Sequence, residues 1–109
     1  MGSRTYLSPN EVVMIKAETN YSLIYMRDGS KILVSTTLKI IEERFKLENS
    51  FERVHRSFLV NLNHMKAVKN GQIFLENNLI CLISRRKLKV IDFDYFAQEN
   101  LNKLLIINI

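Results

Sequence analysis

Apolar residues in the first third of this chain come in short runs separated by polar turns. An apolar run occupies residues 12–15, small polar residues follow at 17–20, and aromatic and β-branched residues resume at 21–26. Asp28-Gly29 then gives a strong hairpin signal, and residues 32–34 are expected to form the returning strand. This spacing predicts a set of short antiparallel strands.

One stretch instead has the period of an amphipathic helix. Leu38, Ile41 and Phe45 recur at helical spacing, and the charged residues between them fall mostly on the opposite face. The hydroxyl residues at 35–37 can cap the N-terminus of such a helix. We predict a helix over about residues 37–47, with its charges forming a solvated face.

After this helix the pattern returns to short strands joined by tight turns. Asn70-Gly71 predicts a second hairpin, and Asn77-Asn78 predicts a further turn. Strands are predicted at residues 51–60, 67–69, 72–76 and 79–83, and short helical segments near 61–66 and after 84. The predicted fold class is therefore mainly β, with short antiparallel sheets joined by tight hairpins and one amphipathic helix.

The apolar residues of these elements are predicted to form the core of one domain, which covers residues 11–91. The predicted core residues are Val12, Ile15, Ile24, Leu33, Leu38, Ile41, Phe45, Val54, Phe58, Val60, Val68, Phe74 and Ile83. Residues 1–10 are expected to be an N-terminal extension, a linker or a cloning remnant. Residues 92–109 are expected to be an apolar C-terminal extension packed on the same domain.

Charge is distributed unevenly along the chain. The whole chain carries +5, whereas residues 53–89 contain eight basic residues and one acidic residue, a net charge of +7. A pI near 9.5 favours an anionic partner, and nucleic acid, an anionic membrane or an acidic protein would each fit. No apolar run has the length of a membrane span, and the N-terminus lacks a signal-peptide pattern. We therefore expect a cytoplasmic protein without membrane insertion.

The residues that could support catalysis or metal binding are poorly arranged for either. His55 and His64 lack the spacings of histidine metal sites, and the one cysteine, Cys81, lies in an apolar run where a buried residue is expected. Ser57 and His55 lie two apart on a predicted strand and need not hydrogen bond. No nucleophile elbow or nucleotide-binding glycine motif is present. We predict no enzymatic activity, no metal and no cofactor.

Two basic clusters carry the strongest functional signal. The first, within residues 51–66, mixes arginine, histidine, serine and asparagine with apolar anchors, as expected of a strand that delivers polar side chains to an edge. There Arg56 can make paired hydrogen bonds to a phosphate or a guanine edge. The second is Ser84-Arg85-Arg86-Lys87, and the short hairpin elements between the clusters can bring both to one face. Nucleic-acid binding is the favoured function on these grounds.

The chain resembles the LytTR DNA-binding domain of bacterial response regulators over roughly residues 11–91. The resemblance rests on Glu18-Thr19-Asn20-Tyr21, on the Asp28-Gly29 hairpin, and on residues 37–42, 51–65 and 83–89, and it is strongest at 51–65. It implies a mostly β fold whose loops, rather than a recognition helix, enter successive major grooves. It also implies transcription regulation in a two-component system through repeated DNA half-sites.

The resemblance further implies the partners and the contact residues. The partners would be double-stranded DNA, a second copy on the adjacent half-site, and a receiver domain N-terminal to this one. No receiver domain is present in the sequence, so we expect an excised or free-standing module. Base-reading positions fall at Tyr21, Arg56 and Arg86, with Ser57 and Lys87 nearby for phosphates. The full predicted DNA-contacting set is Asn20, Tyr21, Ser22, His55, Arg56, Ser57, Lys66, Arg85, Arg86 and Lys87.

A basic protein- or membrane-interaction module without base readout is the alternative function. A membrane patch needs only lysine and arginine with apolar flanks. Here asparagine, serine and histidine are interleaved with the arginines, which favours contacts to base edges. Binding to duplex DNA and to anionic vesicles at matched salt discriminates between the two functions.

Overall fold

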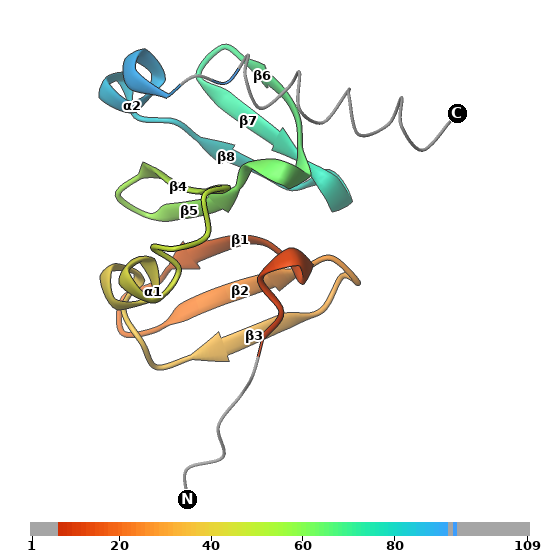
Figure 1. Cartoon of the computed structure of the whole chain (residues 1–109), viewed down its shortest axis with the longest axis vertical. Helices are drawn as coiled ribbons and strands as arrows, with labels where there is room; N and C mark the ends of the chain where they lie inside the picture. Colours follow the sequence, from red (N-terminus) through yellow and green to blue (C-terminus); the bar gives the residue numbers. More distant parts are fainter. Residues whose placement is uncertain (1–6, 92, 94–109) are drawn as a thin grey trace, which may run out of the picture.

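The computed structural model describes residues 7–91 and 93, which form two antiparallel β-sheets, one above the other in Figure 1. This arrangement confirms the mainly β fold class. The strands are β1 (Val12–Ala17), β2 (Ser22–Met26), β3 (Lys31–Val34), β4 (Phe51–His55), β5 (Phe58–Asn61), β6 (Met65–Lys69), β7 (Gln72–Leu75) and β8 (Ile80–Leu82). The helical elements are α1 (Leu38–Arg44), α2 (Arg85–Val90) and the 3₁₀ turns η1 (Pro9–Glu11), η2 (Leu62–His64) and η3 (Glu76–Asn78).

The large sheet has the strand order β3-β2-β1-β5-β4, and neighbouring strands are antiparallel. The turn between β2 and β3 forms at Asp28-Gly29 as predicted, and Gly29 has a φ of +92° that favours glycine. Ser30 donates to Asp28 Oδ1 from its hydroxyl (2.6 Å) and from its backbone N–H (2.9 Å). These bonds stabilise the carboxylate and lower the pKa of Asp28.

The prediction of a single strand over residues 51–60 is wrong. The segment is a hairpin, in which β4 and β5 pair antiparallel with Arg53 opposite Leu59 and His55 opposite Phe58. Arg56-Ser57 is therefore a two-residue turn. Among the described residues, positive φ values occur only at asparagines and glycines, so neither turn residue has the left-handed conformation that marks many hairpins in a sequence. The turn consequently carries no glycine or asparagine signal.

The small sheet has the order β6-β7-β8. Its first turn is the predicted Asn70-Gly71, with φ values of +52° and +75°, as expected for a two-residue hairpin with both central residues in the left-handed region. Asn77 and Asn78 lie in η3, also at positive φ, and lead into β8. Both turn predictions are confirmed, and η2 and α2 lie where short helical segments were predicted.

Helix α1 is shorter than the predicted 37–47. Thr37 is its N-cap, and Thr37 Oγ1 accepts a hydrogen bond from the Ile40 N–H at 3.5 Å. Regular helix ends at Arg44, and Phe45 packs its ring against Phe51 with 4.7 Å between ring centroids. Leu38 and Ile41 are buried, which confirms the predicted apolar face of the helix.

The core has one part between the two sheets and another between the large sheet and α1. Eight predicted core residues are buried: Val12, Ile15, Ile24, Leu38, Ile41, Val54, Val60 and Ile83. The core also contains buried residues that were not predicted, such as Leu59, Leu62 and Ile73.

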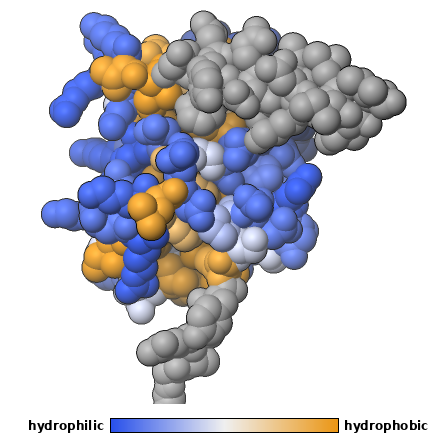
Figure 2. All heavy atoms as spheres, in the orientation of Figure 1, coloured by the Kyte–Doolittle hydropathy of each residue, from blue (hydrophilic) through white to orange (hydrophobic). Residues whose placement is uncertain are grey.

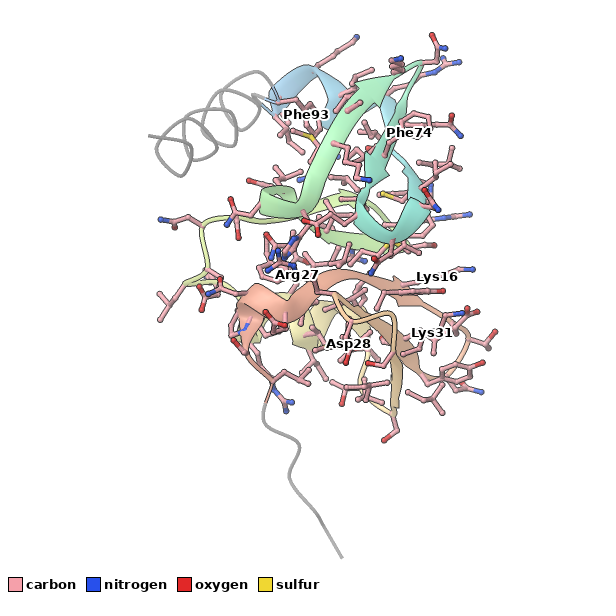
Figure 3. All side chains as sticks on the ribbon, turned by 90° about the vertical axis from the view of Figure 1, so that its right-hand side faces the viewer. Lys16, Arg27, Asp28, Lys31, Phe74 and Phe93 are labelled. Carbon is pink, nitrogen blue, oxygen red and sulfur yellow. The ribbon has the colours of Figure 1, made fainter. Side chains whose placement is uncertain are left out.

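The remaining predicted core residues lie on the wrong face of a strand or at the margin of the core. Leu33 is 62% exposed, because Ile32 and Val34 take the inward face of β3. On β7 the buried residues are Ile73 and Leu75, so Phe74 points to the opposite face, as Figure 3 shows. Four of the predicted core residues are only half-buried: Phe45, Phe58, Val68 and Phe74.

A polar cluster joins the sheets through His64. Its Nε2 donates to the Asn10 carbonyl at 2.7 Å, and its Nδ1 lies 2.5 Å from Glu76 Oε2. Glu76 also pairs with Arg27 at 3.5 Å. Because both ring nitrogens have protein partners, His64 ties η2 to η1 and η3 as a structural residue. Within residues 7–91 and 93, no group of His, Cys, Asp and Glu side chains is arranged to hold a metal ion.

The chain ends lie only partly within the described residues. Leu7 packs against the part of the core next to α1, and Phe93 packs against the part between the sheets. The rest of the predicted extensions, residues 1–6, 92 and 94–109, falls outside the described residues. The predicted domain boundaries therefore stay predictions. In the described part of the chain, neither α-helix combines the length and apolar character needed to cross a membrane.

We expect the Cys81 thiol to be unreactive while the protein is folded. Burial raises the pKa of Cys81 to about 12, so almost no thiolate is present near pH 8. A chromogenic disulfide reagent should therefore label the folded protein far more slowly than the denatured protein, in which the ordinary pKa returns. Equal labelling rates in the two states would contradict the buried position of this residue.

Candidate nucleic-acid interface

Three connecting segments lie along one side of the molecule, on the left in Figure 1. They are the β1–β2 connection (residues 18–21), the β4–β5 turn and the start of α2. The Ala17 N–H donates to the Ser57 carbonyl at 2.8 Å, which joins the end of β1, just before the first segment, to the β4–β5 turn. The Ser84 N–H donates to the Val54 carbonyl at 2.8 Å, which joins β4, just before that turn, to the residue that precedes α2. Backbone hydrogen bonds thus fix the segments relative to one another.

The β4–β5 turn is held by side chains and presents Arg56. Arg53 donates from Nε to the His55 carbonyl at 3.0 Å and from Nη2 to the Arg56 carbonyl at 2.7 Å. The Ser57 N–H donates to His55 Nδ1 at 3.1 Å, so neutral His55 carries its proton on Nε2. Arg56 is exposed, and its guanidinium has no hydrogen-bond or ion-pair partner within residues 7–91 and 93.

Helix α2 adds a second group of cations beside this turn. Ser84 is its N-cap, and Ser84 Oγ accepts from the Lys87 N–H at 3.2 Å. The six-residue helix contains Arg85, Arg86, Lys87 and Lys89, and only Lys87 among them is half-buried. The Ser84 cap therefore fixes the first residue of α2, so the basic residues begin in its first turn.

A hollow of roughly 220 Å³ separates the turn from the helix. Its lining residues are Arg53, His55, Arg56, Ser84, Arg86 and Lys87. The charge of Arg53 is balanced by Glu42 at 2.7 Å, whereas Arg56 and Arg86 have no such acidic partner among the described residues. Burial raises the pKa of Glu52, against the opposing effect of the nearby Lys87 ammonium. With four basic side chains on its lining, the hollow is cationic, and Figure 2 shows hydrophilic side chains projecting from this side of the molecule.

Most of the predicted contact residues come together here. His55, Arg56, Arg86 and Lys87 line the hollow, Ser57 belongs to the turn, and Arg85 begins α2. Asn20 and Tyr21 are exposed in the neighbouring β1–β2 connection.

Two predicted residues are placed differently. Ser22 is fully buried, and its hydroxyl donates to the Thr36 carbonyl at 2.7 Å. Lys66 lies near the start of β6, next to η2, whereas the opposite end of β6 approaches α2 through the Ile83 N–H to Gly71 carbonyl bond. The structure therefore does not bring Lys66 to the hollow, and Ser22 has no exposed side-chain surface.

Sequence reasoning missed the roles of Arg53 and Glu42. The sequence does hold a signal for Arg53. Its long, forked side chain stands two residues before His55 and three before Arg56, so it can reach both of their carbonyls. That signal has meaning only once residues 56–57 are identified as a turn. Glu42 lies on a different element, eleven residues away, and no local pattern links it to Arg53.

Comparisons with known proteins bear on the family and the fold of the chain. The family model of the LytTr DNA-binding domain matches residues 2–92. Among solved structures, the chain is similar to the LytTr DNA-binding domain of a response regulator from Bacillus cereus, with 22% sequence identity and a TM-score of 0.57. That similarity covers 73% of this chain and 76% of the other. A search of curated proteins found no match.

Proposed function

Because the chain belongs to the LytTR DNA-binding domain family, which consists of DNA-binding domains rather than enzymes, we propose that it regulates transcription by reading specific sequences in double-stranded DNA. The observation that carries the proposal is the pair of arginines, Arg56 and Arg86, on the lining of one cationic hollow, where neither has an acidic partner among the described residues. The two come from different elements that backbone hydrogen bonds hold together.

The side chains around the hollow suit two kinds of DNA contact. A planar guanidinium can donate to O6 and N7 of a guanine together, so Arg56 and Arg86 are the proposed base readers. Lysine is a point charge that suits phosphates, which is the proposed role of Lys87. The remaining proposed contacts to the DNA backbone and groove edges come from Asn20, Tyr21, His55, Ser57 and Arg85. We leave Ser22 and Lys66 out of the interface, given where they lie.

The wider arrangement is also a proposal. The domain would act as the output domain of a response regulator or as a free-standing LytTR regulator, reading half-sites in successive major grooves through its loops. A second copy would occupy the adjacent half-site, and a receiver domain would precede this domain in a full-length protein. Binding to a duplex with one half-site and to a duplex with two tests the role of the second copy.

The experiment that tests the function starts by selecting bound duplexes from a random pool. A specific binder should enrich one sequence and bind it about a thousandfold or more tightly than a scrambled duplex. Anionic vesicles at the same salt serve as the comparison. Tighter binding to vesicles than to any duplex would favour the alternative of an interaction module without base readout.

Arg86→Ala should lower the affinity for the selected duplex by about ten- to a hundredfold, because one bidentate arginine–guanine pair discriminates by about 1–3 kcal/mol. Preference at one position of each half-site should relax, and affinity for the scrambled duplex should change far less. Lys87→Ala should weaken binding to both duplexes by similar factors. Titration of both variants on both duplexes measures these effects.

Lys31→Ala is the matched control for this comparison. Lys31 lies over the Tyr25 ring at 5.4 Å, at the end of β3 away from the connection to α1. Its removal subtracts one positive charge without touching the proposed interface, so both affinities should stay close to wild type. Equal losses on the two duplexes for Arg86→Ala would mean that Arg86 clamps phosphates rather than reading bases.

A further inference from the structure

We infer that Arg53 and Glu42 are positioning residues that hold the β4–β5 turn in the conformation from which Arg56 reads DNA. The inference rests on the proposed function and adds to it the residues that set the geometry of one base reader. Neither residue is proposed to contact a base. Arg53 lines the hollow, but its three nitrogens are all engaged within the protein.

One guanidinium makes every contact in this arrangement. Its Nε and Nη2 bind the carbonyls of His55 and Arg56, at 3.0 and 2.7 Å, and its Nη1 binds Glu42 Oε1 at 2.7 Å. The two carbonyls belong to consecutive residues at the turn. Because the guanidinium is planar and rigid, it fixes both carbonyls relative to each other and to α1.

The turn needs such support because its own backbone is weakly constrained. A shift in strand register lies between Arg53 and His55, so the β4–β5 ladder is irregular just before the turn. No glycine stands in the turn to favour a single tight geometry. Ser57 provides two further restraints. Its N–H donates to His55 Nδ1, and its carbonyl accepts from the Ala17 N–H. Arg53 supplies the restraint on the Arg56 carbonyl itself.

Glu42 determines which way the guanidinium plane faces. It lies on α1, whose Leu38 and Ile41 are buried against the large sheet, so the carboxylate is presented from a well-packed element. The side chains of Arg53 and Glu42 are 22% and 42% exposed, and an ion pair with that exposure adds little to stability. Its proposed contribution is therefore the orientation of Arg53. Glu43, the next residue on the helix, is exposed and has no ion-pair partner in the described part of the chain.

The test compares specific with non-specific binding. Arg53→Lys keeps the charge but cannot bind two carbonyls and a carboxylate in one plane. We expect it to lower affinity for the selected duplex by about five- to tenfold, and affinity for the scrambled duplex by less than about twofold, because only the preorganisation of a base reader is lost. Glu42→Gln should cause a smaller loss on the selected duplex, of about two- to threefold, and Glu43→Gln should cause none.

A second measurement separates positioning from general structural support. In an Arg56→Ala background, Arg53→Lys should have no further effect on specific affinity, because the side chain that it positions is gone. Additive losses in that background, or equal losses on both duplexes, would overturn the inference. A wild-type domain that fails to distinguish the selected from the scrambled duplex would overturn the proposed function as well. Discrimination that survives Arg53→Lys unchanged would overturn the positioning role alone.

Discussion

Raising monovalent salt from about 50 to about 200 mM is expected to weaken binding to a scrambled duplex by about 250- to 1,000-fold. Each phosphate that a cation neutralises releases condensed counterions, which gives a slope of about −0.9 per phosphate on a log–log plot. Four cations of the proposed interface have no acidic hydrogen-bond or ion-pair partner among the described residues: Arg56, Arg85, Arg86 and Lys87. The whole segment 53–89 has a net charge of +7. If about five phosphates are contacted on a duplex without a preferred site, the slope should be about −4 to −5.

Single substitutions show which cations contribute to that slope. Lys87→Ala should make it shallower by about one, whereas Lys31→Ala should leave it unchanged. Lys66→Ala tests whether Lys66 contacts DNA, as the sequence predicts, although the structure does not bring it to the hollow. A change of about one would place Lys66 against a phosphate, and no change would agree with its position near the start of β6. A wild-type slope near zero would contradict phosphate contacts altogether.

Turn chemistry explains why much of the fold could be predicted. The Asp28-Gly29 and Asn70-Gly71 turns require residues that tolerate positive φ, and such residues are recognisable in a sequence. The turn at Arg56-Ser57 depends on contacts that are not local in the same sense. Its Ser57 carbonyl accepts a hydrogen bond from Ala17 on β1. The Arg53 guanidinium that binds the turn is itself bound by Glu42 on α1. A turn stabilised in this way leaves no signature in its own residues.

Strand faces were predicted less well than strand positions. Leu33 and Phe74 sit next to apolar neighbours on both sides, so alternation does not reveal which residues point inward. Packing decides the matter, since Ile73 and Leu75 meet the large sheet and Phe74 is left on the outer face. In a continuous apolar run, the sequence pattern therefore does not predict which residues face the core.

The candidate site was predictable as two basic clusters, but not as a set of available side chains. Arg53 and Arg56 look equivalent in the sequence. In the structure Arg53 is bound to Glu42 and to two carbonyls, whereas Arg56 is exposed and unpartnered within residues 7–91 and 93. Ser22 likewise is one residue from exposed Tyr21 and is fully buried. The distinction between a DNA-contacting residue and a supporting residue depends on partners distant in the chain.

Leu38→Ala is expected to lower the free energy of unfolding by about 2–5 kcal/mol, because it removes buried methyl groups and leaves a cavity. Leu38 is 3% exposed and lies in the cluster formed with residues of the large sheet, including Val12 and Leu59. A domain of this size has a total stability of about 5–15 kcal/mol, so the loss is a large part of it. Denaturant unfolding should show a lower midpoint with an unchanged slope.

Ile40→Ala is the matched control on the same helix. Ile40 is 46% exposed, so its truncation removes less buried surface and should cost well under half as much as Leu38→Ala. Both changes place a residue of higher helix propensity on α1, and the two gains differ by only a few tenths of a kcal/mol, so propensity cannot produce most of the difference between them. Similar midpoints for the two variants would contradict the packing of α1 on the large sheet. That packing also presents Glu42 to Arg53, so a destabilised α1 should lower DNA specificity before the whole domain unfolds.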